Sequence, residues 1–535
     1  MPIRPNPTRI AGVCAAVALA VGAATASAAR APNPFESDAA PAPGSRIDEL
    51  VSAQWTRLNL EPAKVCSDAV FVRRVHLDVI GTLPTGLEAQ EFIRDRNPNK
   101  RRLVIDRLLA REEFADYWAM KWSDLLRVKA EFPINLWPNA AQAYHRWIPT
   151  CLRTNAPYDR FVRELLTSSG SNFRVGPVNF YRAVQSKEPP ALAQAVALTF
   201  MGVRAEKWPK ERLSGMAVFF AQVGYKSTAE WKEEIVFFDP GKTNAFTAGG
   251  RPNAPAVFPD GTPARLSPDR DPREVFAEWL IDPKNPWFTR NIANRVWSWL
   301  LGRGIIHEPD DLRPDNLPQN PELLAWLEGQ LIANHYDLKH LYRLILNSKT
   351  YQLSSLPGTD SPEAEAQFTH YPLRRLDAEV LIDAINQITG GTEKYTSAIP
   401  EPFTFIPETE RSIALPDGSI SSAFLETFGR PPRDTGLERE RNNRPTAAQR
   451  LHLLNSSQIR RKIEQSRMIQ YQTRSRKSPR EVAVGIYLGV LSRFPTEEES
   501  RIVEAYYEAG GVTPREAAVD LAWALINSAE FLYRH

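Results

Sequence analysis

Apolar residues recur at intervals of three and four along most of the chain, which is the spacing of helices buried on one face. The pattern is densest between Asn285 and Ser355, where three helices are predicted. The first should begin at Asn285, an N-cap residue type, with Pro286 in the first helical position. Gly302 and a second glycine two residues later supply its C-terminal stop.

The second and third helices of this stretch carry similar start signals. Asn320 followed by Pro321 predicts one N-terminus, and Asp337 predicts the other. The apolar stripes of the three helices should face a core that includes Trp297 and Trp299.

Start signals of the same kind mark helices near both ends of the chain. Thr85 with Glu88, and Thr496 with Glu499, have the spacing of capping boxes. Between them, aromatic residues recur at helical spacing, which favours a core over a surface that stacks on sugar rings or bases; these are Phe114, Trp118 and Trp122. The fold class predicted is mainly α and multi-helical, with few short strands.

Composition divides the chain of 535 residues into segments. From Pro240 to Pro268, ten of the 29 residues are Gly or Pro, which predicts a linker between two helical domains. A leader rich in Ala and Pro precedes the first domain. The predicted organisation is 1–28 signal peptide, 29–45 disordered leader, 46–239 first helical domain, 240–270 linker and 271–535 second helical domain.

The N-terminus has the features of a secretory signal. A basic start with Arg4 and Arg9 precedes a run of small apolar residues and an Ala-Ser-Ala cleavage site ending at Ala28. A lipid anchor on Cys14 is the alternative. No later segment has the ~18 uninterrupted apolar residues of a membrane helix. We therefore expect an exported protein, periplasmic or extracellular, with no transmembrane segment in the mature chain.

Two cysteines, Cys66 and Cys151, remain after cleavage at this site. An exported protein can keep them as a disulfide, and two buried thiols are the alternative.

Charge is balanced overall at +3 but uneven locally. From Arg430 to Arg480 there are 14 Lys and Arg against four acids. Such a tract can bind an anionic polysaccharide, and solvated helix faces are the alternative. Nucleic acid is not an expected partner of an exported protein.

Few residues offer catalytic chemistry. His76 and Asp78 would share a face if they lay on a strand, and together they could orient a nucleophile or bind a metal. His307, Asp310 and Asp311 share a polar loop, where they could bind Ca²⁺ or act as an acid–base pair. Ion pairs with Arg295, Arg303 or Arg313 are the structural alternative. These five are weak catalytic candidates.

Longer motifs reveal a family resemblance. The region from Ile47 to about Phe238, with RRVHLDVIGTLPT and FADYWAMKWSDLLRV, resembles the domain of unknown function numbered 1549. The region from about Asp271 to Tyr533, with NPWFTRNIANRVWSWLLGRGII and YDLKHLYRLILNSKTYQLSS, is similar to the domain numbered 1553. The resemblance implies a secreted, planctomycete-type protein of a cytochrome-associated family with no established activity.

This chain departs from the family pattern at two places. The resemblance implies a Cys-x-x-Cys-His shortly after Gly202-Val203-Arg204, where this chain has Ala205 and Glu206. It also implies a Cys-x-Cys where Leu437 and Arg439 stand. Their joint loss predicts that the two positions meet in space and that this chain carries no metal, haem or other cofactor.

Together these observations predict a binding or scaffolding protein of an extracytoplasmic assembly, with a protein partner in the cell envelope. Two alternatives stay open. One is a docking component of a c-type cytochrome redox system, and the other is a hydrolase that acts on polysaccharide.

Overall fold

The computed structural model describes residues 33–37, 42–242, 255–474 and 477–535. The predicted signal peptide lies outside these residues. The described chain is mainly α with a few short strands, so the predicted fold class is confirmed. No helix among the described residues is long and apolar enough to cross a membrane.

The N-terminal half is a succession of helices that ends in a small sheet. Its elements are α2 (Arg46–Leu58), α3 (Asp68–Val79), α4 (Gly86–Arg94), α5 (Lys100–Leu109), α6 (Glu112–Leu125), α7 (Pro138–Arg153), α8 (Tyr158–Thr167), β1 (Gly170–Ser171), η1 (Gly176–Tyr181), α9 (Pro189–Val196), η2 (Ala197–Met201), η3 (Ala205–Lys207), α10 (Lys210–Ala217), η4 (Val218–Phe220), β2 (Val223–Ser227) and β3 (Glu234–Phe238). The three strands are antiparallel in the order β1-β3-β2.

The C-terminal half is also helical. Its elements are α11 (Pro272–Ile281), α12 (Phe288–Leu301), α13 (Pro321–Ala333), α14 (Leu338–Asn347), α15 (Pro362–Ala366), β4 (Arg374–Arg375), α16 (Ala378–Thr389), η5 (Ser412–Ala414), α17 (Ala423–Thr427), η6 (Glu438–Glu440), α18 (Ala447–Asn455), α19 (Ser457–Glu464), α20 (Arg467–Arg474), α21 (Pro479–Leu491), α22 (Glu497–Glu508), α23 (Pro514–Ile526), α24 (Ala529–Leu532) and β5 (Tyr533–Arg534).

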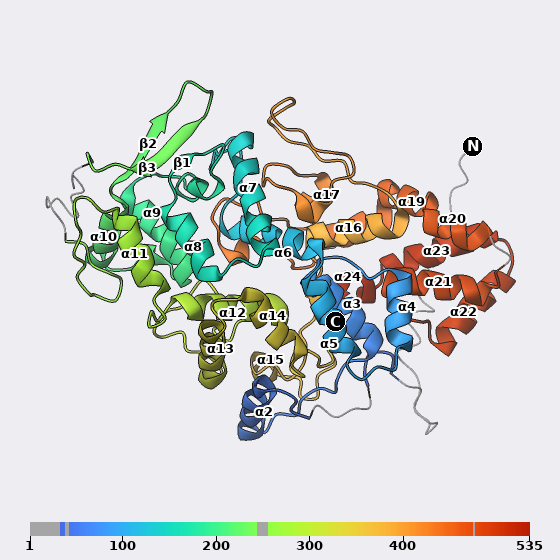
Figure 1. Cartoon of the computed structure of the whole chain (residues 1–535). Helices are drawn as coiled ribbons and strands as arrows, with labels where there is room; N and C mark the ends of the chain where they lie inside the picture. Colours follow the sequence, from blue (N-terminus) through green and yellow to red (C-terminus); the bar gives the residue numbers. More distant parts are fainter. Residues whose placement is uncertain (1–32, 38–41, 243–254, 475–476) are drawn as a thin grey trace.

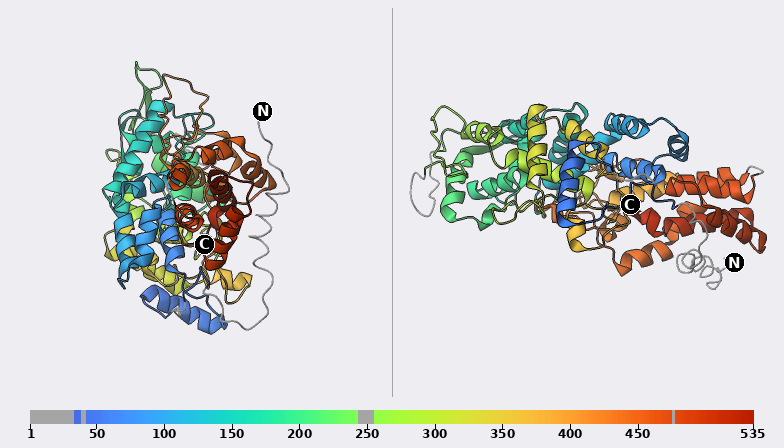
Figure 2. Two further views of the ribbon diagram at one scale, coloured as in Figure 1. Left: turned by 90° about the vertical axis from the view of Figure 1, so that its right-hand side faces the viewer. Right: turned by 90° about the horizontal axis from the view of Figure 1, so that it is seen from below.

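The molecule is elongated, with β2 and β3 near one end and α20 to α23 at the other (Figures 1 and 2). The C-terminus does not lie at an end. Strand β5 pairs antiparallel with β4, with Arg374 opposite Arg534, and this pairing brings the last residues back to the middle of the molecule beside α3.

The predicted helix starts in the central stretch are largely confirmed. Asn320 and Asp337 cap α13 and α14 through their side chains. Helix α12 begins at Phe288 rather than Pro286, although the Asn285 side chain still accepts hydrogen bonds from the backbone N–H groups that follow it. Gly302, with φ +75°, ends this helix as predicted.

The two predicted capping boxes are also present. Thr85 and Glu88 open α4, and Thr496 and Glu499 open α22. In each case the side chains of both residues bond the backbone of the other, as the sequence spacing predicts.

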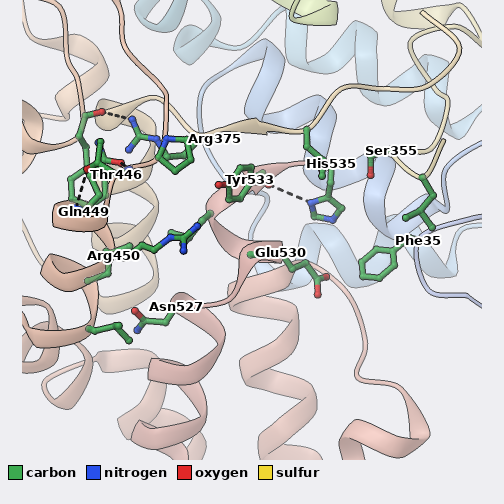
Figure 3. A pocket seen from close by; sticks show the side chains of 18 residues that line it. Phe35, Ser355, Arg375, Thr446, Gln449, Arg450, Asn527, Glu530, Tyr533 and His535 are labelled. Carbon is green, nitrogen blue, oxygen red and sulfur yellow. Dashed lines mark hydrogen bonds between the residues drawn. The ribbon is translucent and has the colours of Figure 1, made fainter. Parts of the chain in front are cut away.

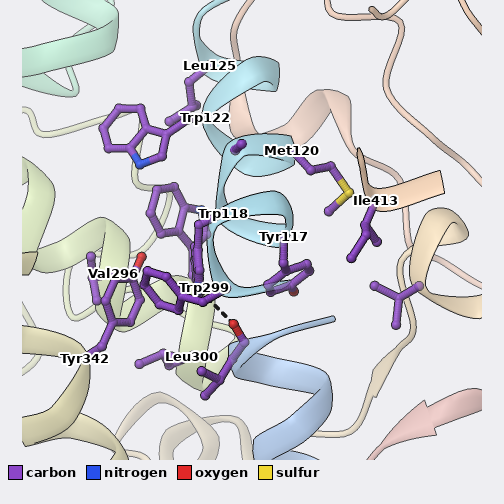
Figure 4. Packing of buried hydrophobic residues seen from close by; sticks show 14 of the residues in the cluster. Tyr117, Trp118, Met120, Trp122, Leu125, Val296, Trp299, Leu300, Tyr342 and Ile413 are labelled. Carbon is purple, nitrogen blue, oxygen red and sulfur yellow. Dashed lines mark hydrogen bonds between the residues drawn. The ribbon is translucent and has the colours of Figure 1, made fainter. Parts of the chain in front are cut away.

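One continuous core runs through both halves of the chain. At its centre Trp118 of α6 lies 5.3 Å from Trp299 of α12 and 4.5 Å from Tyr342 of α14, between ring centroids (Figure 4). Trp122, one turn after Trp118, also contacts Trp299. The aromatic residues predicted to be core are therefore buried, and they join two halves that composition treats as separate domains.

Buried charges converge beside this aromatic cluster. The Asp377 carboxylate is fully buried and accepts hydrogen bonds from Lys121 at 3.0 Å, Arg534 at 3.0 Å and Asn443 at 2.7 Å. Burial alone would raise its pKa, but the surrounding cations hold the pKa of Asp377 well below its ordinary value. The carboxylate therefore stays ionised and connects α6, the start of α16 and the C-terminal strand.

Two predictions about the N-terminal part need correction. Residues 33–37, expected within a disordered leader, lie against the core: Ser37 N–H donates to the Val65 carbonyl, and the Phe35 ring meets His535 edge-on. His76 and Asp78 lie on helix α3 and not on a strand, so they point to different sides. A helix turns by about 100° per residue, which prevents residues i and i+2 from sharing a face.

Cys66 is buried and Cys151 half-buried, and both are free thiols. Burial raises the pKa of Cys151 to about 12, so it is protonated at neutral pH.

Replacing Asp377 by Ala should unfold the protein at much lower denaturant. The change leaves Lys121 buried without its counter-charge and removes one of the two carboxylates beside Arg534, which keeps Asp78 at 3.4 Å. Breaking a buried pair in this way costs about 3–5 kcal/mol. Urea denaturation monitored by circular dichroism measures it. As a control, replacing Glu49, which pairs with Arg46 on the surface, by Ala should change the free energy of unfolding by less than about 0.5 kcal/mol. Equal effects at the two sites would show that the buried carboxylate has no special role.

Candidate functional site

Helix α12 presents a buried polar face to the loops around it. Asn291, Asn294 and Arg295 are each at most 1% exposed. Asn294 accepts from the Ile306 N–H and donates to the Ile306 carbonyl, while Asn291 donates to the Thr199 carbonyl in η2. One helix face thus contacts both η2 and the loop after α12, which are about a hundred residues apart in sequence.

The loop after η2 approaches the loop after α12 very closely at Gly202. Gly202 has φ +64°, and its carbonyl accepts a hydrogen bond from the Leu312 N–H at 2.9 Å. A Cβ atom at this position would lie 2.6 Å from Asn291 Oδ1 and 2.8 Å from the Pro309 carbonyl oxygen. Only glycine combines this backbone conformation with this approach.

Asp310 holds the same loop from its other side. One carboxylate oxygen pairs with Arg295 at 3.0 Å and the other accepts the Glu438 N–H at 2.6 Å. Arg295 also reaches the Glu438 carboxylate at 3.4 Å, and burial raises the pKa of Glu438. The loop from His307 to Arg313 is therefore a bridge between residue 202 and residue 438.

A cleft of about 470 Å³ opens where these loops meet. Its walls come from η3 and α10 of the N-terminal half, and from the start of α12 and residues 311–318 of the C-terminal half. Two half-buried indoles, Trp208 and Trp287, form apolar parts of the wall. The volume lies within the roughly 300–1,000 Å³ of small-molecule sites.

Cations dominate the polar part of the cleft. Five basic residues line it against two acids, Asp311 and Asp315. Both acids pair with the same arginine, Arg313, at 2.9 and 3.5 Å. The other four basic residues are Arg204, Lys207, Arg212 and Arg290.

These four cations differ in how well they are neutralised. Arg290 pairs with Glu328 at 3.0 Å, and Arg204 lies 3.6 Å from Glu308. Within the described part of the chain, no carboxylate lies within 4 Å of Lys207 or Arg212. Arg212 stacks on Trp208, with 4.1 Å from its Cζ to the ring centroid, and burial lowers its pKa. The cleft lining therefore has more positive than negative charge beside the two indoles, although Asp260, outside the lining, acts electrostatically on Arg212.

The residues proposed as catalytic from sequence are only partly in this cleft. Asp311 lines it, paired with Arg313, whereas Asp310 is buried behind it and His307 is exposed outside its lining. The ion pairs with Arg295 and Arg313 are those named as the structural alternative. His76 and Asp78 lie in the core elsewhere, where Asp78 accepts from the Tyr351 and Tyr371 hydroxyls.

The two positions where the resemblance implies cysteines are next in sequence to residues that contact the bridge loop. Glu206 is exposed in η3, four residues after Gly202, and Leu437 directly precedes Glu438, whose N–H bonds Asp310. Among the described residues, no group of three or more His, Cys, Asp or Glu has a geometry that could hold a metal ion. That the two positions meet in space stays a prediction.

The basic tract from Arg430 to Arg480 is not a single exposed surface. Arg430, Arg433 and Arg441 are directed inward, and Arg433 and Arg441 pair with Asp124 at 2.9 and 2.7 Å. Arg441 also pairs with Glu379 at 2.7 Å. Counting charges along the sequence misses these partners because they lie up to 317 positions away.

Sequence reasoning missed the residues that make the cleft. Lys207, Trp208, Arg212 and Trp287 have no motif, and the two indoles are about 80 positions apart. One sequence signal could have indicated this region. Asn291, Asn294 and Arg295 are spaced three and four residues apart on a helix that is otherwise apolar, and polar residues on a buried helix face imply buried hydrogen-bond partners.

These features define a class of protein: a mainly helical chain with a cationic, ligand-sized cleft between its two halves. Family models for two domains match it. Residues 46–209 match the protein of unknown function DUF1549 and residues 272–507 match the protein of unknown function DUF1553. The chain belongs to the family that pairs these two domains, as its motifs predict. Searches of curated proteins and of solved structures find no match.

Replacing Gly202 by Ala should destabilise the protein, because a side chain at positive φ costs about 1–3 kcal/mol before any clash is counted. Gly329 provides the matched control, since it lies in helix α13 with nothing within 4 Å of a Cβ atom. Its change to Ala should stabilise the helix by about 0.5–1 kcal/mol. Urea denaturation compares the two, and a neutral Gly202→Ala would contradict the close approach of the loops.

His76 should make the protein less stable in acid. Burial lowers its pKa to about 4, with a bond from Nδ1 to the Val72 carbonyl, whereas the unfolded residue titrates near 6.5. The unfolded state therefore binds a proton first as the pH falls from 6.5 to 4, and stability falls by up to about 1.4 kcal/mol per pH unit. His76→Asn should flatten this slope in urea titrations, while the same change at exposed His335 should not. Identical slopes in both variants would contradict the assignment.

Proposed function

We propose that this chain is an exported binding protein and that the cleft between its halves takes an anionic saccharide. The proposal rests on the presence of two kinds of side chain in one cleft. Lys207 and Arg212 have no carboxylate within 4 Å among the described residues, and they lie beside the indoles of Trp208 and Trp287.

The charge of the ligand follows from the balance in the cleft. Both acids that line the cleft pair with Arg313. Among the other lining cations, Arg204 lies 3.6 Å from Glu308 and Arg290 pairs with Glu328, and neither of these two acids lines the cleft. A cation that is partly desolvated is stabilised by an anion that replaces the lost water. Guanidinium groups bind carboxylates and similar anions through two parallel hydrogen bonds, which also fixes orientation.

The shape of the ligand follows from the indoles. The Arg212 Cζ lies 4.1 Å from the Trp208 ring centroid and 5.9 Å from that of Trp287, so the guanidinium and both rings share one wall of the cleft. Sugar rings have an apolar face that packs on indoles and hydroxyl groups at their edges that bond polar side chains. A uronic acid combines such a face with a carboxylate.

Asp310 does not support a hydrolase at this site. It is 2% exposed, and its two oxygens are occupied by Arg295 and the Glu438 N–H. A general acid or base must reach the proton that it transfers. Binding rather than cleavage is therefore the activity that the geometry favours, and the cytochrome-docking and hydrolase roles stay predictions.

Titration calorimetry with a uronic-acid trisaccharide tests the proposal. The wild-type chain should bind trigalacturonate and not the neutral trisaccharide maltotriose. Lys207→Gln and Arg212→Gln should each weaken binding about tenfold or more, since a bond to a charged group contributes about 1.5–3 kcal/mol. Added salt should also weaken binding.

Lys210→Gln is the matched control, because Lys210 is exposed at the start of α10 and does not line the cleft. It should leave the affinity unchanged. Equal binding of the neutral trisaccharide, or equal losses in all three variants, would contradict a charge-selective cleft.

A further inference from the structure

A second and larger cavity lies on the C-terminal side of the molecule, away from the cleft. Its volume is about 680 Å³, and it is lined by residues of α18, α24, β4, β5 and the segment that contains Phe35. Most of the side chains that line it are apolar. Six of them are Phe35, Leu373, Phe428, Leu453, Leu454 and Leu532.

The apolar wall is open to solvent. Leu356 is 43% exposed, Leu373 59% and Leu454 46%, and all three line the cavity. Apolar side chains left in water around a concave space favour a ligand that covers them, because each Å² removed from water contributes about 25 cal/mol. The main body of a ligand for this cavity should therefore be apolar.

Polar groups in the cavity leave an excess of positive charge at one side. Arg450 extends from α18 into the cavity toward Tyr533, and Arg375 also lines the cavity (Figure 3). Within the described chain, neither arginine has a carboxylate within 4 Å. Arg375 bonds only backbone carbonyls, of Phe428, Asn442 and Asn443, and its buried Nη1 has no hydrogen-bond partner.

The other titratable groups of the cavity do not offset this charge. The one lining side-chain carboxylate, Glu530, is held in a two-pronged pair by Arg493, with distances of 2.6 and 2.8 Å, and the main-chain oxygen of His535 accepts from Arg74 at 2.8 Å. Burial lowers the pKa of His535 to about 3, so its side chain is neutral at pH 7. The cavity thus combines a long apolar wall with a cationic site in reach of it.

We infer that this cavity binds a single-chain amphipathic anion, a long-chain fatty acid, with its hydrocarbon along the leucines and its carboxylate at Arg450. Charge complementarity selects the carboxylate and the volume limits the ligand to one chain. The site is independent of the cleft, and no residue lines both.

Displacement of cis-parinaric acid, a fluorescent fatty acid, from the full chain tests the inference. Palmitate should displace it with a saturable, one-to-one profile. Hexadecanol, with the same chain length and no charge, should be at least about tenfold weaker, because it cannot form the charge-assisted bonds. Absence of saturable binding, or equal potency of acid and alcohol, would overturn the inference.

Three variants assign the site. Arg450→Gln should weaken palmitate binding about tenfold. Arg461→Gln, an exposed arginine of the next helix that does not line the cavity, should leave it unchanged. Ala529→Trp places a large ring in the cavity from an exposed position and should abolish displacement. Unchanged thermal midpoints and circular dichroism show that each variant is folded.

Unaltered binding in Arg450→Gln or Ala529→Trp would place the fatty acid elsewhere and overturn the assignment. Vesicles of dioleoylphosphatidylglycerol separate a lipid surface from a single chain. If the protein binds the vesicles and palmitate does not displace it from them, the ligand of the cavity is a membrane surface and not a single fatty acid.

Discussion

The fold depends on a carboxylate that is fully removed from water. Asp377 begins α16 in the C-terminal half, and its main partners come from α6 and from the last strand. A buried charge is tolerated only when opposite charges and hydrogen bonds replace its hydration, so Lys121, Arg534 and Asn443 must all be in place. This requirement fixes how the two halves and the C-terminus meet, and the tryptophan cluster beside it supplies the apolar area that stabilises the junction.

The same junction positions the cleft. Helix α12 contributes Trp299 to the aromatic core on one side and Asn291, Asn294 and Arg295 to the bridge loop on the other. The side chains that line the cleft come from both halves, and the contacts of α12 hold the backbone segments that carry them. Because the supporting polar groups are buried and the lining cations are on the surface of the cleft, changes in the lining can alter ligand preference without disturbing the scaffold.

Local features of the chain could be predicted from sequence because their causes are local. The caps at Asn320, Asp337 and Thr496 act within three residues, and the burial of Trp118 and Trp122 follows from their spacing. The pairs that decide function are not local. Arg441 lies in a basic tract of the sequence, but in the structure it pairs with Asp124. Arg212 lies beside Trp287, which is 75 positions away in the sequence. His76 and Asp78 were the reverse case, in which a short spacing suggested a shared face that a helix does not provide.

Hydrogen–deuterium exchange with bound trigalacturonate tests the central claim most directly, because it reports where in the chain a ligand reduces backbone opening. Two segments should gain protection together, residues 203–212 and residues 311–318, since both line the cleft. Residues 443–474 of the basic tract should exchange at an unchanged rate. Protection confined to that tract, with none at the cleft, would contradict the account.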